Sequence, residues 1–145
     1  MADPSDGWQH VDLPEVGVAF GYPRRTPNGQ AVELDDVRVH ARSEDGEEAY
    51  FELSRHLGAT ALRRYEDERD FLVARYGAEV TPLTATTLDG LPAQEFTAAF
   101  GDTLRRFVLV ERGRWFYRVV YDPRSPLNLA VLETIRIRPA ARTRR

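Results

Sequence analysis

Residues 94–123 read QEFTAAFGDTLRRFVLVERGRWFYRVVYDP and decide the fold. The segment is rich in β-branched and aromatic residues, and two glycine-containing dipeptides, Gly101-Asp102 and Arg112-Gly113, interrupt it. Tight turns between apolar runs of this kind are typical of β-hairpins. The sequence therefore predicts consecutive antiparallel strands, with Arg112-Gly113 as a two-residue loop that places Val110 opposite Trp115.

Both faces of this predicted hairpin are apolar, because side chains alternate between the faces of a strand. One face carries Phe107, Leu109, Phe116 and Val120, with Arg105, Arg118 and a Glu111–Arg114 pair. The other face carries Leu104, Val108, Val110, Trp115, Tyr117, Val119 and Tyr121, with Arg106 as its one charge. A solvated face would be polar. We therefore expect a single-domain α+β fold in three layers, with an antiparallel sheet of six or seven strands between helices.

Two helices are predicted to cover these faces. Residues 60–76 form the longer one, with Thr60 as its N-cap and Gly77 as its C-cap. Its apolar stripe is expected to be Leu62, Tyr65, Leu72 and Tyr76. The shorter helix begins at Ser125-Pro126 and runs to about residue 134, before a short strand at 135–137. Further strands are expected within residues 16–22, 37–42, 49–54 and 80–88, and residues 8–13 are expected to be extended.

Composition limits the compartment and the chemistry. The chain has 145 residues, is 42% hydrophobic and contains no cysteine, which excludes disulfides and thiolate ligands. Its first residues, MADPSDGWQH, do not resemble a signal peptide. We therefore expect a cytoplasmic protein without membrane insertion.

The basic residues are all arginine, and five of them lie within residues 136–145, where there is no acid. The rest of the chain is acidic, which argues against a broad nucleic-acid surface. We expect residues 1–137 to form the domain and residues 138–145 a basic, solvated tail, although such a tail could also contact phosphates.

No metal, cofactor or catalytic residue is predicted. His10, His40 and His56 lack the spacing of a metal site. The acidic loop at residues 43–48 suggests calcium, but its Asp45-Gly46 pair is already explained as a hairpin turn. Ser54 and His56 are close in sequence, which means little because catalytic partners are assembled in space.

Four local motifs, in this order along the chain, resemble the PsbP-like superfamily. They are the strand and proline at 17–23, the turn Leu88-Asp89-Gly90-Leu91-Pro92-Ala93, the Arg112-Gly113-Arg114 hairpin before an aromatic strand, and the strand–proline–helix–strand passage at 121–137. The superfamily includes the extrinsic photosystem II protein, a yeast nuclear-import factor that binds the Ran GTPase, and bacterial DcrB-like proteins. The resemblance implies an antiparallel sheet between helices and a docking or accessory role. The chain departs from the lipoprotein members because it lacks their lipidated cysteine.

Three functions compete at this point. The first is a non-enzymatic binding or accessory protein of bacterial origin that docks a protein partner. The second comes from a resemblance to one cytoplasmic bacterial branch, the chaperones that shield hydrophobic segments of type VI secretion effectors, and for it we expect a homodimer. The third is a small enzyme of unknown reaction.

The candidate partner-binding residues are Arg106, Trp115, Tyr117 and Tyr121, which share one face of the predicted hairpin. Aromatic residues and arginine are favoured in recognition surfaces. Arg106 interrupts an apolar face, and a charge there needs either solvent or a carboxylate partner. The alternative is that the aromatic rings pack under the C-terminal helix and that Arg106 pairs with Glu95 on the neighbouring strand. The sequence leaves both interpretations open.

Overall fold

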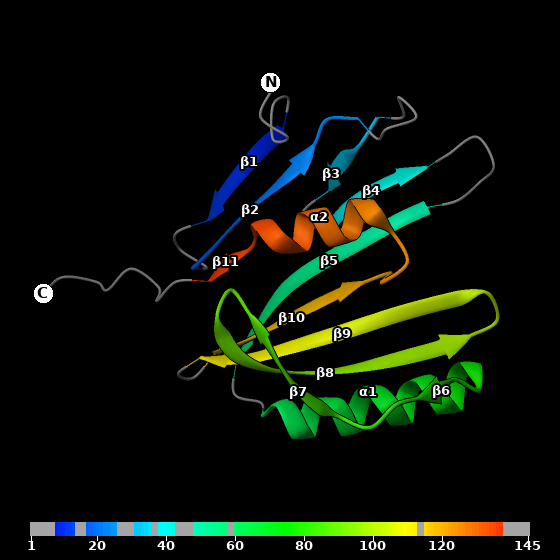
Figure 1. The fold of residues 1–145 in the computed structure, drawn as a ribbon. Coiled ribbons are helices and arrows are strands. Elements are labelled where there is room, and N and C mark those ends of the chain that lie inside the picture. Colours follow the sequence, from blue (N-terminus) through cyan, green and yellow to red (C-terminus); the bar gives the residue numbers. More distant parts are fainter. Residues whose placement is uncertain are drawn as a thin grey trace, which may run out of the picture.

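The structure is a computed structural model and describes residues 8–13, 17–25, 31–35, 38–42, 48–57, 60–112 and 115–137 (Figure 1). These residues form an α+β fold with two helices and eleven strands. The elements are β1 (Trp8–Leu13), β2 (Val18–Pro23), β3 (Glu33–Asp35), β4 (Arg38–Arg42), β5 (Glu48–Leu57), α1 (Ala61–Tyr76), β6 (Glu79–Val80), β7 (Thr84–Leu88), β8 (Leu91–Phe100), β9 (Thr103–Arg112), β10 (Trp115–Tyr121), α2 (Pro126–Thr134) and β11 (Arg136–Ile137).

The strands make two antiparallel sheets. The large sheet has the order β3-β4-β5-β10-β9-β8-β6, and β7 also pairs with β8. The small sheet has the order β1-β2-β11. The predicted count of six or seven strands was too low. Residues 80–88, expected as one strand, form parts of β6 and β7, because Pro82 between them has no N–H to continue the ladder.

The central hairpin has a register two residues away from the predicted one. Arg112 lies opposite Trp115, and Tyr117 lies opposite Val110. Glu111 lies opposite Phe116, and Arg114, its expected partner, lies outside the described residues. A shift of two residues leaves every side chain on its predicted face, because the side-chain period of a strand is two. The two faces were therefore predicted correctly despite the error in register.

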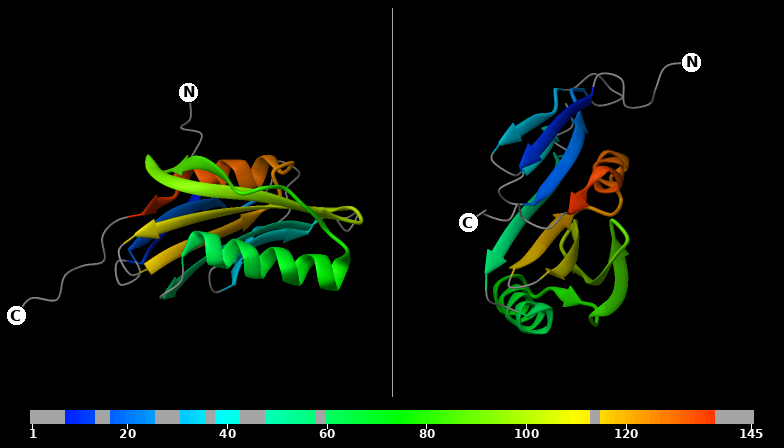
Figure 2. Two further views of the ribbon diagram at one scale, coloured as in Figure 1. Left: turned by 90° about the horizontal axis from the view of Figure 1, so that it is seen from below. Right: turned by 90° about the vertical axis from the view of Figure 1, so that its left-hand side faces the viewer.

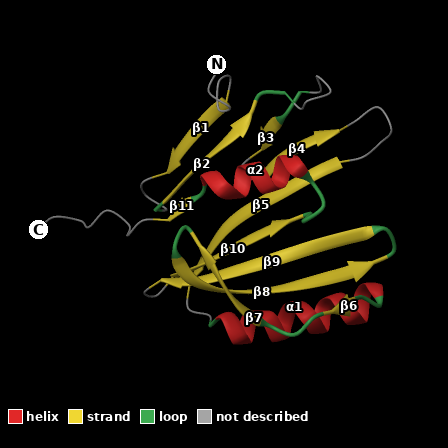
Figure 3. Ribbon diagram, in the orientation of Figure 1, coloured by secondary structure: helices red, strands yellow, loops and turns green. Residues whose placement is uncertain are grey.

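Each face of the large sheet has its own hydrophobic core, as the two-sided hairpin predicts. On one face, Phe107, Leu109, Phe116 and Val120 pack with α1. On the other, Val108, Val110, Tyr117, Val119 and Tyr121 pack with α2 and with the small sheet. The two helices therefore lie on opposite sides of the large sheet (Figures 2 and 3). No helix among the described residues is long and apolar enough to span a membrane.

Helix α1 has the predicted caps but a narrower buried face than predicted. The Thr60 side chain accepts a hydrogen bond from Arg63 N–H, and Gly77 has the left-handed conformation with φ of 64°. Tyr65 and Leu72 are buried, whereas Leu62 and Tyr76 are 58% and 50% exposed. Ala61 takes the place of Leu62 in the core, because successive helical residues point about 100° apart.

The small sheet joins the two ends of the described chain. Strand β11 follows α2 directly and pairs with β2 at Val18 and Ala19. Its Ile137 N–H donates to the carboxylate of Asp89, in the turn between β7 and β8, at 2.9 Å. This contact joins β11 to the β7–β8 turn, while the pairing with β2 holds the end of α2 beside the small sheet. The predicted tail, residues 138–145, lies outside the described residues, as do residues 43–47 of the acidic loop.

Candidate functional site

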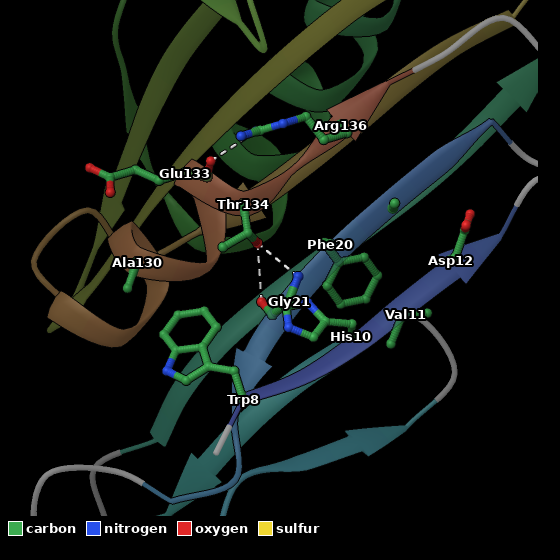
Figure 4. A pocket seen from close by; sticks show the side chains of 11 residues that line it. Trp8, His10, Val11, Asp12, Phe20, Gly21, Ala130, Glu133, Thr134 and Arg136 are labelled. Carbon is green, nitrogen blue, oxygen red and sulfur yellow. Dashed lines mark hydrogen bonds between the residues drawn. The ribbon is translucent and has the colours of Figure 1, made fainter. Parts of the chain in front are cut away.

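A cleft of about 650 Å³ lies between the small sheet and the C-terminal end of α2 (Figure 4). Strands β1 and β2 form one wall, and α2 and the start of β11 form the other. The lining residues are Trp8, His10, Val11, Asp12, Ala19, Phe20, Gly21, Ala130, Glu133, Thr134 and Arg136. Most of this lining is apolar or aromatic, with charged side chains at its margin.

Small residues on β2 make room for the larger side chains of β1. Gly21 lies opposite His10, and Ala19 lies opposite Asp12. A Cβ atom on Gly21 would meet Gln9 O, His10 Nδ1 and Trp8 Cε3, each at 3.3 Å. The missing side chain therefore allows the indole and imidazole rings to lie over β2, where they line the cleft (Figure 4).

Thr134 lines the cleft and makes, at Gly21, main-chain hydrogen bonds of the kind that a neighbouring strand would make to β2. The Gly21 N–H donates to Thr134 Oγ1 at 2.8 Å. The same oxygen lies 3.2 Å from Gly21 O and 2.6 Å from Val131 O, which share its single proton. This hydroxyl is thus engaged with main-chain groups and acts as a structural bridge between α2 and β2.

The charges at the margin of the cleft are mainly negative. Asp12 and Glu133 are exposed, one on β1 and the other on α2. Arg136 donates to the carbonyl oxygens of Glu133 at 3.0 Å and Ile135 at 2.8 Å, and lies 3.8 Å from Asp89. The Arg136 side chain is 51% exposed and keeps its positive charge, so the cleft has two carboxylates against one guanidinium.

The four residues predicted from the sequence do not form one open surface. Tyr117 and Tyr121 are 2% and 3% exposed and belong to the core under α2. Trp115 and Tyr121 are six residues apart on β10, which corresponds to about 20 Å along a strand. Their partner-binding role stays a prediction, but Tyr117 and Tyr121 have almost no surface to offer a partner.

Arg106 and Trp115 are the half-buried members of the predicted set, and each has a neighbour within the protein. Arg106 Nε donates to Thr97 Oγ1, directly across the pair of strands, at 3.4 Å. Burial raises the pKa of the Tyr121 phenol, and a hydrogen bond with Arg106 opposes this rise. The Arg55 guanidinium lies 3.7 Å from the centre of the Trp115 ring. Thr97, not Glu95, is therefore the cross-strand partner of Arg106.

A second polar cluster lies between α1 and the large sheet. Ser54 Oγ is 2.8 Å from His56 Nε2, and His56 stacks on Phe116 with ring centres 5.0 Å apart. Burial, and then the positive charges of Arg64 and Arg118, lower the pKa of His56. The nearby carboxylates of Glu52 and Glu68 pair with Arg118.

This cluster does not have the arrangement of a catalytic triad. In a triad, a carboxylate accepts a hydrogen bond from the imidazole and orients it. Among the described residues, the carboxylates next to His56 are bound by guanidinium groups. The cluster therefore links α1 to the sheet, and we assign no catalytic role to Ser54 or His56.

The sequence did not identify the cleft residues as a site. Trp8 and Asp12 lay in a segment that was only expected to be extended, and His10 was considered only as a metal ligand. The available signal was the alternation of small residues, Gly17, Ala19 and Gly21, along the next strand. Glycine within a strand often marks a place where another group approaches closely.

No protein-family model matches the sequence, and no curated protein matches it. The structure is similar to the solution structure of a cyanobacterial PsbP (CyanoP) from Synechocystis, with a TM-score of 0.56 and 15% sequence identity. The similarity covers 90% of this chain and 92% of the other. At this identity the similarity establishes the fold alone. The antiparallel sheet, the helix on each of its faces and this similarity together show that the chain has a PsbP-like fold.

Proposed function

We propose that this chain is a non-catalytic binding or accessory protein that docks a protein partner at the cleft between the small sheet and α2. The observation that carries the proposal is the cleft itself, a concave surface with an indole and an imidazole on its wall and carboxylates at its margin. We further propose that the protein is bacterial and that it meets its partner in the cytoplasm.

The chemistry of the lining favours recognition over catalysis. Buried aromatic anchors surrounded by polar groups contribute most of the binding energy in protein interfaces. The half-buried Trp8 ring has the size and polarity of such an anchor. The Thr134 hydroxyl, by contrast, is engaged with main-chain atoms. A catalytic nucleophile would need a base within reach, and in the described part of the cleft this hydroxyl is not paired with one.

A matched pair of tryptophan substitutions tests where the partner docks. The chain contains two tryptophans, Trp8 in the cleft and Trp115 on the face predicted from the sequence. We expect Trp8→Ala to weaken capture of the partner at least about tenfold, as for an interface anchor. Trp115→Ala should leave capture unchanged. The measurement is quantitative mass spectrometry of proteins retained by each immobilised, folded variant from the native host.

The opposite result would assign the docking surface to another part of the molecule. Loss of capture with Trp115→Ala or Arg106→Ala, and normal capture with Trp8→Ala, would contradict the cleft and favour the sheet face. Thermal unfolding of each variant shows whether a loss of capture is only a loss of folded protein.

A second candidate function, a chaperone for hydrophobic segments of secretion effectors, has one observation in its favour. Four large apolar side chains on α1 are about half exposed, namely Leu62 (58%), Phe71 (56%), Val73 (48%) and Tyr76 (50%). Two of them, Phe71 and Tyr76, are neighbours with ring centres 6.3 Å apart, and contiguous exposed apolar surface is found at sites of protein interaction. Its test is binding of a synthetic apolar helix, which Phe71→Ser with Tyr76→Ser should abolish and Trp8→Ala should not affect.

A further inference from the structure

We propose that residues 138–145 of this chain, RPAARTRR, bind in the cleft and compete there with the partner. The inference rests on the proposed function, because it assigns a regulator to the same site. It commits to one occupant, a basic segment that the protein itself carries immediately after β11.

Charge is the first argument. The segment contains four arginines and no acid. The lining of the cleft carries two exposed carboxylates, Asp12 and Glu133, against one guanidinium, Arg136, so one negative charge is in excess. The Arg136 guanidinium donates to the carbonyl oxygens of Glu133 and Ile135. Arginine binds carboxylates through charge-assisted hydrogen bonds that are stronger than neutral ones. The carboxylates of the cleft are hydrogen-bond acceptors, and the four arginines of the segment are hydrogen-bond donors.

The indole of Trp8 supplies the second argument. A guanidinium group is attracted to the face of an aromatic ring, and tryptophan is the best such ring. Trp8 is half buried and lies on the wall of the cleft, next to Ala130 of α2 (Figure 4). An arginine that reaches this ring would have an aromatic contact that the carboxylates alone cannot provide.

The length of the segment is sufficient to reach the cleft. Ile137 lies opposite Val18, which pairs with Leu13, and Trp8 is five residues from Leu13 on β1. The offset along the strand is about 17 Å, and the two strand spacings between β11 and β1 bring the separation to about 20 Å. Because β11 runs antiparallel to β2, the segment leaves Ile137 in the direction away from Trp8 and has to turn back. Eight extended residues span up to about 26 Å, so after a tight turn the last two arginines, Arg144 and Arg145, reach Trp8. A short tether of this kind gives an effective concentration in the millimolar range, which makes even weak contacts competitive.

The first experiment observes the cleft in the full-length chain. Arg138→Gln, Arg142→Gln, Arg144→Gln and Arg145→Gln are combined in one neutral-tail variant. Because the chain has two tryptophans, its indole N–H groups give two resonances in a nitrogen–proton correlation spectrum, which Trp8→Phe assigns. We expect the Trp8 resonance to shift in the neutral-tail variant and the Trp115 resonance to stay in place. An unchanged Trp8 resonance would overturn the inference.

The second experiment measures competition with a fluorescein-labelled RPAARTRR peptide. The neutral-tail variant should bind the peptide at least tenfold more tightly than the wild-type chain, since its own tail no longer occupies the cleft. Asp12→Asn with Glu133→Gln in the same background should abolish binding. Glu66→Gln with Asp70→Asn, which removes the same charge from exposed positions on α1, should preserve it. Equal binding by the wild-type and neutral-tail chains would contradict competition.

The two proposals can fail separately. If the Trp8 resonance does not respond to the tail but Trp8→Ala still abolishes partner capture, the tail inference fails and the binding function stands. If the resonance responds but Trp8→Ala leaves capture unchanged, the cleft holds the tail and the partner docks elsewhere.

Discussion

At the scale of single residues, His56 combines burial with positive neighbours. Burial, followed by Arg64 and Arg118, lowers its pKa below the ordinary 6.5. As pH falls through 6.5, the unfolded chain takes up a proton before the folded protein does. Stability is therefore retained above this value and lost as pH falls toward the lower, folded pKa.

This linkage predicts how a substitution changes the pH response. His56→Gln keeps a donor or acceptor for Ser54 but does not titrate, so its melting temperature should fall less than that of the wild type between about pH 8 and about pH 5. The matched control is Ser54→Ala, which removes the hydroxyl beside the imidazole but keeps the titrating group, and which should retain the wild-type response. Equal pH responses of His56→Gln and wild type would contradict the assignment.

The sequence left open whether Tyr117 and Tyr121 are buried, for a reason that also belongs to this scale. A tyrosine or arginine on a sheet face has the same appearance in the sequence whether a helix covers it or a partner does. The side of β10 under α2 is fully packed, and the Arg106 charge is accommodated by Thr97 and Tyr121. Accessible surface depends on where α2 lies, and hairpin spacing alone does not contain that information.

At the scale of elements, Arg118 joins α1 to the large sheet. Its Nη1 lies 3.0 Å from Glu52 of β5, and its Nε contacts Glu68 of α1. These three side chains are only 11–19% exposed. Arg118→Leu leaves two carboxylates without their shared cation, and we expect it to lower the free energy of unfolding by about 2–4 kcal/mol.

The control for this change is Arg63, an exposed arginine on α1. Arg63→Leu removes a pair with Asp67 whose side chains are 75% and 62% exposed, and its cost should be below about 1 kcal/mol. Urea unfolding of both variants gives the comparison. Similar losses in the two variants would show that Arg118 does not anchor the helix.

Elements were more predictable than the site because their signals are local. Thr60 and Gly77 fix the ends of α1 through their own hydrogen bonds and conformation, and Ser125-Pro126 does the same for α2. The cleft instead combines β1 with the end of α2, and its key contact joins Gly21 to Thr134. No local pattern in either segment specifies that the two meet.

At the scale of the whole molecule, one sheet serves two cores. Val119 and Val120 are neighbours in β10, yet they belong to opposite cores and are 0% and 5% exposed. Because β10 cannot leave one core without leaving the other, we expect both cores to unfold in a single transition. Val119→Ala and Val120→Ala should each cost about 2 kcal/mol and keep coincident melting by circular dichroism and by tryptophan fluorescence. Two separate transitions in either variant would indicate two independent folding units.

The bond between Gly21 and Thr134 joins positions 113 residues apart, and β11 pairs with β2 over a similar separation. While a ribosome is still making the chain, β1 and β2 have each other but not the neighbour that completes their sheet. The cleft can exist only after the segment containing α2 and β11 has been synthesised. Contacts between such distant segments also slow folding, because the intervening loop must close before the contact contributes. The proposed binding site is therefore complete only after residue 137 has been synthesised.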